Sequence, residues 1–152
     1  RVKGRQVCQG YLDPALDAEA FDEDGWFRTG DLGIVDADGF VSITGRLKDI
    51  IIRKGENISA KEIEDILFSH PAVADVAVVG LPDSASGEIA CAIVVNKDGA
   101  GLTFDDMVTF LKDAELSRHK IPERLEIVDA LPRNPSGKVL KKDLRATYGG
   151  QA

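Results

Sequence analysis

The stretch 45–64 constrains the fold of this chain more than any other, because three kinds of local structure follow one another in it without a break. The isoleucines at 50–52 are β-branched and continuous, which predicts a short strand buried on both faces. Lys54 and the glycine after it predict a turn. Ser59 and Glu62 have the spacing of a helix capping box. Such a connector is expected where a second domain begins, although a loop inside one domain has the same local pattern.

Downstream of this stretch, apolar runs and turn residues alternate in a way that predicts a small domain with its own core. The pattern indicates a helix from about Ala60 to His70, a helix capped by Thr103 with Phe104, Val108 and Leu111 on one side, a last helix over about 139–146, and strands over 73–79, 88–95 and 125–128. We therefore predict an α+β fold for residues 48–152, with a three-stranded core sheet and flanking helices.

The preceding residues 1–47 predict much less structure. Apolar runs flank Asp36-Ala37-Asp38-Gly39, a strong β-hairpin signal. A lone hairpin is marginally stable in water, yet this segment carries many apolar side chains. We hypothesise that residues 1–47 are the tail of a larger N-terminal domain and that their apolar side chains pack against the rest of that domain. Self-association of the chain is then expected as well.

Composition narrows the class of protein further. The formal net charge of −7 argues against a general nucleic-acid binder. Cys8 and Cys91 have no disulfide or zinc spacing, His70 and His119 form no metal cluster, and a reducing, cytoplasmic location fits. No apolar run approaches the length of a transmembrane helix. The chain opens without Met, so we interpret it as a piece of a longer protein.

Lys138 is the strongest candidate for a residue that binds an anion or takes part in catalysis. Prolines at 132 and 135 stiffen the loop before it, and Gly137 allows a tight turn. A lysine at a helix start would make a good anion pocket with the helix N-terminus. The loop is not a Walker A motif, because Pro132 stands where that motif needs glycine. A solvated surface lysine remains the simpler interpretation of the loop taken alone.

Asp31 and Arg46 are a second candidate, since they flank a hairpin whose strands are about equally long. Both side chains should therefore lie at its open end. A carboxylate suits a ribose diol, because it accepts hydrogen bonds from two hydroxyl groups. Arg46 could assist there, or the two residues could simply form an ion pair.

These candidates lie within five segments with distinctive sequences: residues 25–31 (GWFRTGD), 45–49 (GRLKD), 54–64, 82–88 and 132–138 (PRNPSGK). In their order and spacing, these segments closely resemble the C-terminal end of the adenylate-forming superfamily, which includes acyl-CoA synthetases, luciferases and peptide-synthetase adenylation domains. The string from Lys48 to Ile52 and that from Gly55 to Ile58 look most like bacterial acyl-CoA synthetases for medium-chain, alicyclic or otherwise bulky acids.

The resemblance implies an AMP-forming ligase that activates a carboxylic acid with ATP and Mg²⁺ and passes the acyl group to CoA. It implies that Asp31 holds the ribose and Arg46 assists there. Lys48 would be the hinge of a mobile lid formed by residues 48–152, and Lys138 the adenylation lysine. The implied CoA contacts are Gly55 and, more weakly, Arg53 and Lys54, because relatives often have a small residue at position 54.

The resemblance also implies what lies elsewhere: the phosphate loop, the Mg²⁺ ligands and the acid-binding pocket belong to the missing N-terminal domain. The chain alone should therefore be inactive. Two alternatives stay open, namely the lid of a carrier-protein-loading ligase or peptide-synthetase adenylation domain, and a binding module without catalysis. We expect no nucleic-acid partner and no metal site within the chain.

Overall fold

The structure is a computed structural model that describes residues 1–150. The chain divides into two compact units, Arg1–Lys48 and Asp49–Ala152. The boundary expected from the sequence, between residues 47 and 48, falls one residue earlier. No helix among the described residues is both long and apolar enough to traverse a membrane.

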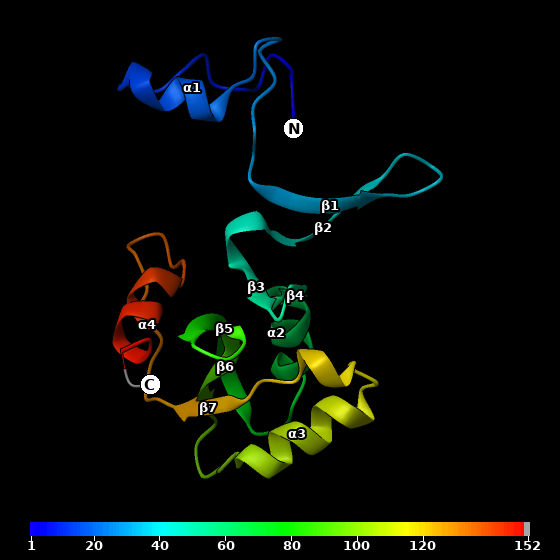
Figure 1. Cartoon of the computed structure of the whole chain (residues 1–152), viewed down its shortest axis with the longest axis vertical. Helices are drawn as coiled ribbons and strands as arrows, with labels where there is room; N and C mark the ends of the chain where they lie inside the picture. The colour runs from blue at the N-terminus through cyan, green and yellow to red at the C-terminus, as the bar shows by residue number, and fades with distance from the viewer. Residues whose placement is uncertain (151–152) are drawn as a thin grey trace. The chain divides into compact units, whose positions relative to one another are not determined.

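The first unit contains a short helical segment and a hairpin (Figure 1). A 3₁₀ turn, Pro14–Leu16, leads into α1 (Asp17–Ala20), and β1 (Asp31–Val35) pairs antiparallel with β2 (Val41–Arg46). Asp36 organises the turn, since its side chain accepts hydrogen bonds from the amides of Asp38 and Phe40, and Gly39 adopts a φ of +88°. The hairpin predicted around residues 36–39 is therefore confirmed.

The second unit is built on a five-stranded sheet of β3 (Ile50–Arg53), β4 (Glu56–Ser59), β5 (Val73–Asp83), β6 (Gly87–Asn96) and β7 (Arg124–Ile127). β5 pairs antiparallel with β6 along its whole length, and β7 pairs parallel with β6 over Cys91–Val94. The predicted three-stranded core corresponds to β5, β6 and β7. The short strand predicted at residues 50–52 is β3. Together with β4, which was not predicted, it forms a hairpin that joins β6 through Arg53 and Gly87 and extends the sheet to five strands.

Three helices complete the unit: α2 (Ala60–Phe68), α3 (Phe104–Asp113) and α4 (Lys141–Tyr148), with a 3₁₀ turn at Arg118–Lys120. Ser59 caps α2 by accepting a hydrogen bond from the Glu62 amide. Thr103 and Asp106 form a full capping box at α3. Both predicted N-caps are present, but the capping box predicted at Ser59 and Glu62 is only half formed, since the Glu62 carboxylate pairs with Lys120 instead.

Helices cover both faces of this sheet, which explains why its central strands are apolar at almost every position. Val76 and Val78 of β5 face α2 and α3 within one buried cluster, which also holds Ile63 and Met107. The alternate residues contribute to a second cluster closed by Leu144 of α4. Figure 1 shows α2 and α3 on one side of β5 and β6 and α4 on the other.

Three local predictions need correction. Ile51 is buried, but Ile52 is 54% exposed, because the second cluster contains no residue of β3 and leaves that face of the strand open. Phe104 is 41% exposed, and Met107 instead joins Leu111 as the buried residues of α3. The last helix begins at Lys141, two residues later than expected.

Candidate functional site

The open end of the β1–β2 hairpin brings Asp31 and Arg46 together. They are direct cross-strand partners, and the Arg46 Nε lies 2.9 Å from the Asp31 Oδ1. A cavity of about 350 Å³ lies at this end, lined by Thr29, Gly30, Arg46, Leu47 and Lys48. The predicted ion pair is therefore present, and it stands beside a space large enough for part of a nucleotide.

The Asp31 side chain keeps 25% of its surface exposed despite this ion pair. Among residues 1–150, no group donates a hydrogen bond to its Oδ2, so that oxygen can still accept a hydrogen bond from a hydroxyl group. The amide of Asp31 donates to the Thr29 hydroxyl, which holds the backbone at the start of β1. The carboxylate can thus accept hydrogen bonds from a diol, and its neighbour Gly30 and its ion-pair partner Arg46 both line the cavity.

The predicted CoA-contacting residues lie together in the turn between β3 and β4. Lys54 and Gly55 both have positive φ, +50° and +82°, so the turn has the mirror-image geometry that suits a right-handed hairpin twist. Lys54 is one of two non-glycine residues with positive φ in the described chain. The amide of Lys54 donates to the Ser86 carbonyl at 2.8 Å, which fixes the turn against the loop before β6.

Arg53 is engaged inside the second unit. Its guanidinium forms an ion pair with Glu123 and donates to the carbonyl of His119 at 2.8 Å. Glu123 in turn accepts a hydrogen bond from the Ala90 amide in β6. This arrangement gives Arg53 a structural role that the sequence did not indicate, and it leaves Lys54 as the exposed cation of the turn.

Lys138 lies in an exposed loop between β7 and α4. Among the described residues its ammonium has no ion-pair or hydrogen-bond partner, whereas Arg133, Lys141 and Arg145 around it all contact carboxylates. Lys138 is therefore a cation without a carboxylate partner among the described residues, and the three cations around it each form an ion pair with a carboxylate.

The expectation that Lys138 begins a helix was wrong, since α4 begins three residues later. The loop amides of Ser136 and Lys138 both donate to the Asn134 Oδ1, at 3.1 and 2.8 Å. Because these N–H groups are already satisfied, the loop can offer an anion the Lys138 side chain but not a helix N-terminus. Asn134 and Arg133 organise this loop, and sequence reasoning missed both.

Other titratable groups have local roles. Hydrogen bonds from the Ser86 hydroxyl and amide lower the pKa of Asp83. Burial raises the pKa of the Cys91 thiol to about 12, which makes it an unreactive core residue. His119 lies 3.3 Å from Glu56 on the surface. No group of three or more His, Cys, Asp or Glu residues in the described part of the chain could hold a metal ion.

The arrangement therefore has three parts: a carboxylate–guanidinium pair at a cavity, a cationic hairpin turn, and a presented lysine. Residues 62–138 match the family described as AMP-binding enzyme C-terminal domain. The chain belongs to this family.

Relatives of this AMP-binding C-terminal domain are similar to it in sequence and structure over nearly the whole chain. A methyl-dioxo-octahydroindenyl-propanoyl:CoA ligase of Rhodococcus jostii (strain RHA1) is 48% identical over 95% of the chain, and a medium-chain fatty-acid–CoA ligase of Escherichia coli (strain K12) is 45% identical over 94%. The crystal structure of ATP-bound MatB from Rhodopseudomonas palustris superimposes with a TM-score of 0.89 at 41% identity over 97% of the chain.

The AMP-binding C-terminal domain is a minor part of those proteins. The chain spans 28% of the Rhodococcus ligase, 26% of the Escherichia ligase and 29% of MatB. The resemblance to the C-terminal end of adenylate-forming enzymes and the α+β class are thus confirmed. The roles of individual residues stay predictions.

Proposed function

We propose that this chain is the C-terminal part of an ATP-dependent, AMP-forming acid–CoA ligase, in which residues 48–152 act as a mobile lid. The single observation that best supports the proposal is Lys138. Among the described residues it is an exposed cation without a partner, and it lies at the end of the segment 62–138 that matches the family. The ligase names of the relatives agree with this assignment.

Lys138 would act in the first half-reaction. A carboxylate must attack the α-phosphate of ATP, which brings two anions together and builds further negative charge on the phosphoryl oxygens. An ammonium held there reduces the repulsion and stabilises the developing charge. Its neighbours Arg133 and Lys141 could not replace it, because each already neutralises a carboxylate of its own unit.

Asp31 would hold the ribose of ATP and then of the acyl-adenylate. The available Oδ2 and the adjoining cavity support this role, and Arg46 would orient the carboxylate through their 2.9 Å contact. ATP supplies the leaving pyrophosphate of this chemistry. The residues of this chain bind and orient its ribose.

The second half-reaction needs a thiol in place of Lys138. We propose that the lid turns about Lys48, which withdraws Lys138 and brings the β3–β4 turn to the thiol. Gly55, without a side chain, would let the pantetheine pass close to the backbone. Lys54 would meet CoA phosphates, and the contribution of Arg53 would be indirect, through its contacts to Glu123 and His119.

The acid substrate would be fatty or alicyclic, in line with the names of the two relatives. Its pocket would belong to the N-terminal domain with which this chain pairs. The exposed apolar side chains of the hairpin, Ile34, Val35, Phe40, Val41 and Ile43, would be covered by that domain.

The decisive experiment compares Lys138→Ala with Lys142→Ala in the full-length ligase. Lys142 is also exposed and has no partner among the described residues, so it is a matched control. Lys138→Ala should slow adenylation about 100- to 1,000-fold and spare thioester formation from supplied acyl-adenylate. Lys142→Ala should change neither rate. Equal loss of both half-reactions in Lys138→Ala would contradict the lid mechanism.

The acceptor is tested separately. With purified full-length enzyme and acyl-adenylate, CoA should yield the thioester, whereas a carrier protein bearing a phosphopantetheine arm should not. Acylation of the carrier protein in preference to CoA would instead identify a carrier-loading ligase, and it would leave the assigned role of Lys138 unchanged.

A further inference from the structure

We infer that Asn134 and Arg133 are positioning residues, which hold the 132–138 loop in the shape that presents Lys138. The inference rests on the proposed function of Lys138 and deepens it. Neither residue needs to touch a substrate; each acts by fixing the backbone from which the Lys138 side chain projects.

Asn134 builds the loop from inside. Its Oδ1 accepts hydrogen bonds from the Ser136 hydroxyl at 2.8 Å, the Ser136 amide at 3.1 Å and the Lys138 amide at 2.8 Å. The Asn134 amide donates to the carbonyl of Lys138 at 2.9 Å. Both backbone polar groups of Lys138 are therefore bonded to Asn134, so this one residue determines where the lysine backbone lies.

Arg133 attaches the loop to the sheet. One guanidinium nitrogen donates to the Asp75 Oδ2 on β5, and the other donates to the carbonyl of Gly137, each at 2.5 Å. Gly137 has a φ of +82°, a conformation that only glycine adopts readily. The guanidinium thus connects the residue just before Lys138 with a rigid strand.

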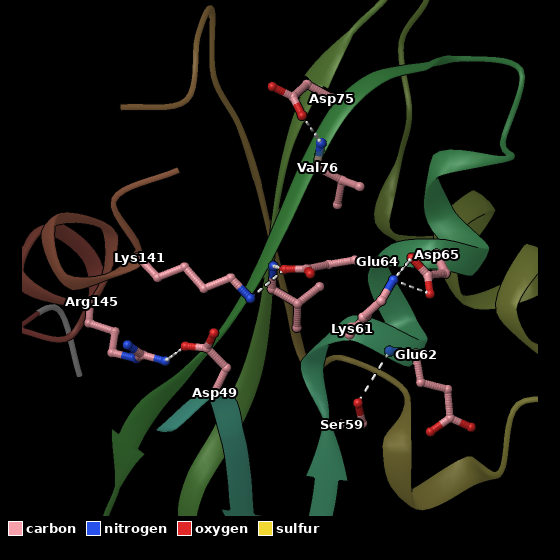
Figure 2. A network of polar contacts seen from close by, with 11 residues as sticks. Asp49, Ser59, Lys61, Glu62, Glu64, Asp65, Asp75, Val76, Lys141 and Arg145 are labelled. Carbon is pink, nitrogen blue, oxygen red and sulfur yellow. Dashed lines mark hydrogen bonds and ion pairs between the residues drawn. The ribbon is translucent and has the colours of Figure 1, made fainter. Parts of the chain in front are cut away.

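α4, which follows the loop, is held by two more ion pairs (Figure 2). Lys141 lies 2.7 Å from the Glu64 Oε1 of α2, and the two side chains are only 17% and 19% exposed. The same Glu64 oxygen accepts a hydrogen bond from the Val78 amide. Arg145 lies 3.1 Å from the Oδ1 of Asp49, the residue immediately before β3. Both ends of the loop are therefore attached to the sheet and its helices.

These contacts explain why an exposed loop can present a lysine reproducibly. Ordering a free loop at the moment of reaction costs conformational entropy for every residue that must be fixed. A loop fixed beforehand leaves only the lysine side chain to be ordered. Catalytic groups must be held within a fraction of an ångström of their productive place, and supporting side chains supply that precision.

The test uses Asn134→Leu, which has a similar volume but no acceptor, and Asn134→Asp, which keeps the acceptor oxygen. In the whole chain, Asn134→Leu should speed amide hydrogen exchange at residues 136–138 at least tenfold and leave β5 and β6 unchanged. In the full-length ligase it should slow adenylation about 10- to 100-fold and spare thioester formation from acyl-adenylate. Asn134→Asp should restore both.

Arg133→Met is the second variant, because it removes both guanidinium contacts at an exposed site and should reproduce the pattern. Faster exchange in the loop with normal adenylation would overturn the inference, as would equal losses in both half-reactions. If Lys138→Ala itself leaves adenylation unchanged, the proposed function fails. A defect in Lys138→Ala together with normal adenylation in Asn134→Leu and Arg133→Met removes only the positioning role.

Discussion

The two units of this chain bury their apolar side chains very differently. Every fully buried apolar residue of the described chain lies in the second unit, on one face or the other of the five-stranded sheet. In the first unit Gly45 is the one buried residue, and eleven of the fifteen exposed large apolar side chains of the described chain lie there. Phe21 and Phe27, with ring centroids 5.2 Å apart, are the aromatic contact of that unit.

This contrast teaches that similar apolar content can serve two purposes. In the second unit it drives folding, because strands buried on both faces and three amphipathic helices remove it from water. In the first unit it remains on the surface, and contiguous exposed apolar patches mark surfaces that other protein covers. We therefore expect the second unit to be a cooperative folding unit and the first to depend on its surroundings.

The largest effect is expected when the two units are separated after Lys48. A chain of residues 49–152 should unfold in one cooperative transition with a midpoint close to that of the whole chain, because its core and ion pairs are internal. Residues 1–48 alone should show no cooperative transition, since an isolated hairpin is marginal in water. Circular dichroism during thermal and denaturant unfolding measures both. A cooperative transition in residues 1–48 would show that the first unit folds on its own.

Truncation of matched isoleucines sharpens the comparison. Ile93 is 0% exposed in the central strand β6, and Ile34 is 63% exposed in β1. Ile93→Ala should lower the free energy of unfolding by about 2–5 kcal/mol, because it removes buried methyl groups and leaves a cavity. Ile34→Ala should change it by less than about 0.5 kcal/mol. Denaturant titration of the whole chain measures both, and equal losses would contradict the division.

The sequence predicted most of what local rules determine. The Asp36–Gly39 turn, the two helix caps and the three central strands all depend on residues close together in the chain. The turn at Lys54 and Gly55 was predicted, but strand β4 after it was not, because its sequence Glu-Asn-Ile-Ser contains a single apolar residue and so shows no strand periodicity. The exposure of Ile52 was not predicted, because it depends on which residues pack against that face of β3 in the folded chain. The second cluster contains no residue of β3, so that face stays open.

The candidate site was predictable to a similar extent. The adjacency of Asp31 and Arg46 follows from hairpin register, and the exposure of Lys138 follows from the turn residues around it. The contacts of Arg133 to Asp75 and of Arg145 to Asp49 join residues 58 and 96 positions apart, and no local pattern encodes such pairs. These long-range contacts around Lys138 were therefore visible only in the folded chain, whereas the contacts of Asn134 to Ser136 and Lys138 are local.

Helix caps provide a smaller comparison. Thr103 caps α3 in the second unit, and Asp13 caps the 3₁₀ turn in the first unit by accepting from the Ala15 amide. Thr103→Ala should lower the free energy of unfolding by about 1 kcal/mol. Asp13→Ala should leave the cooperative transition unchanged, because that turn contributes no buried residue. Denaturant midpoints compare the two variants, and a matching loss in Asp13→Ala would contradict the division.

The smallest expected effect is in the pH dependence of stability. The pKa values of Asp83 in the second unit and Asp22 in the first both lie below the ordinary value of 3.8, chiefly because of hydrogen bonds from Ser86 and from the Trp26 amide, respectively. A carboxyl group whose pKa is lower in the folded state stabilises that state above its unfolded pKa. The contribution is lost as pH falls through the folded value.

Asp83→Asn should therefore lower the stability of the chain most above about pH 4, and its difference from the unsubstituted chain should narrow as pH falls further. Asp22→Asn should leave the cooperative transition unchanged at every pH, because the first unit does not take part in it. Denaturant titrations at pH 7, 4 and 3 test both variants. If Asp22→Asn shows the same pH-dependent loss as Asp83→Asn, the two units share one cooperative transition. The surface of the first unit would then belong to the folding core in spite of its exposure.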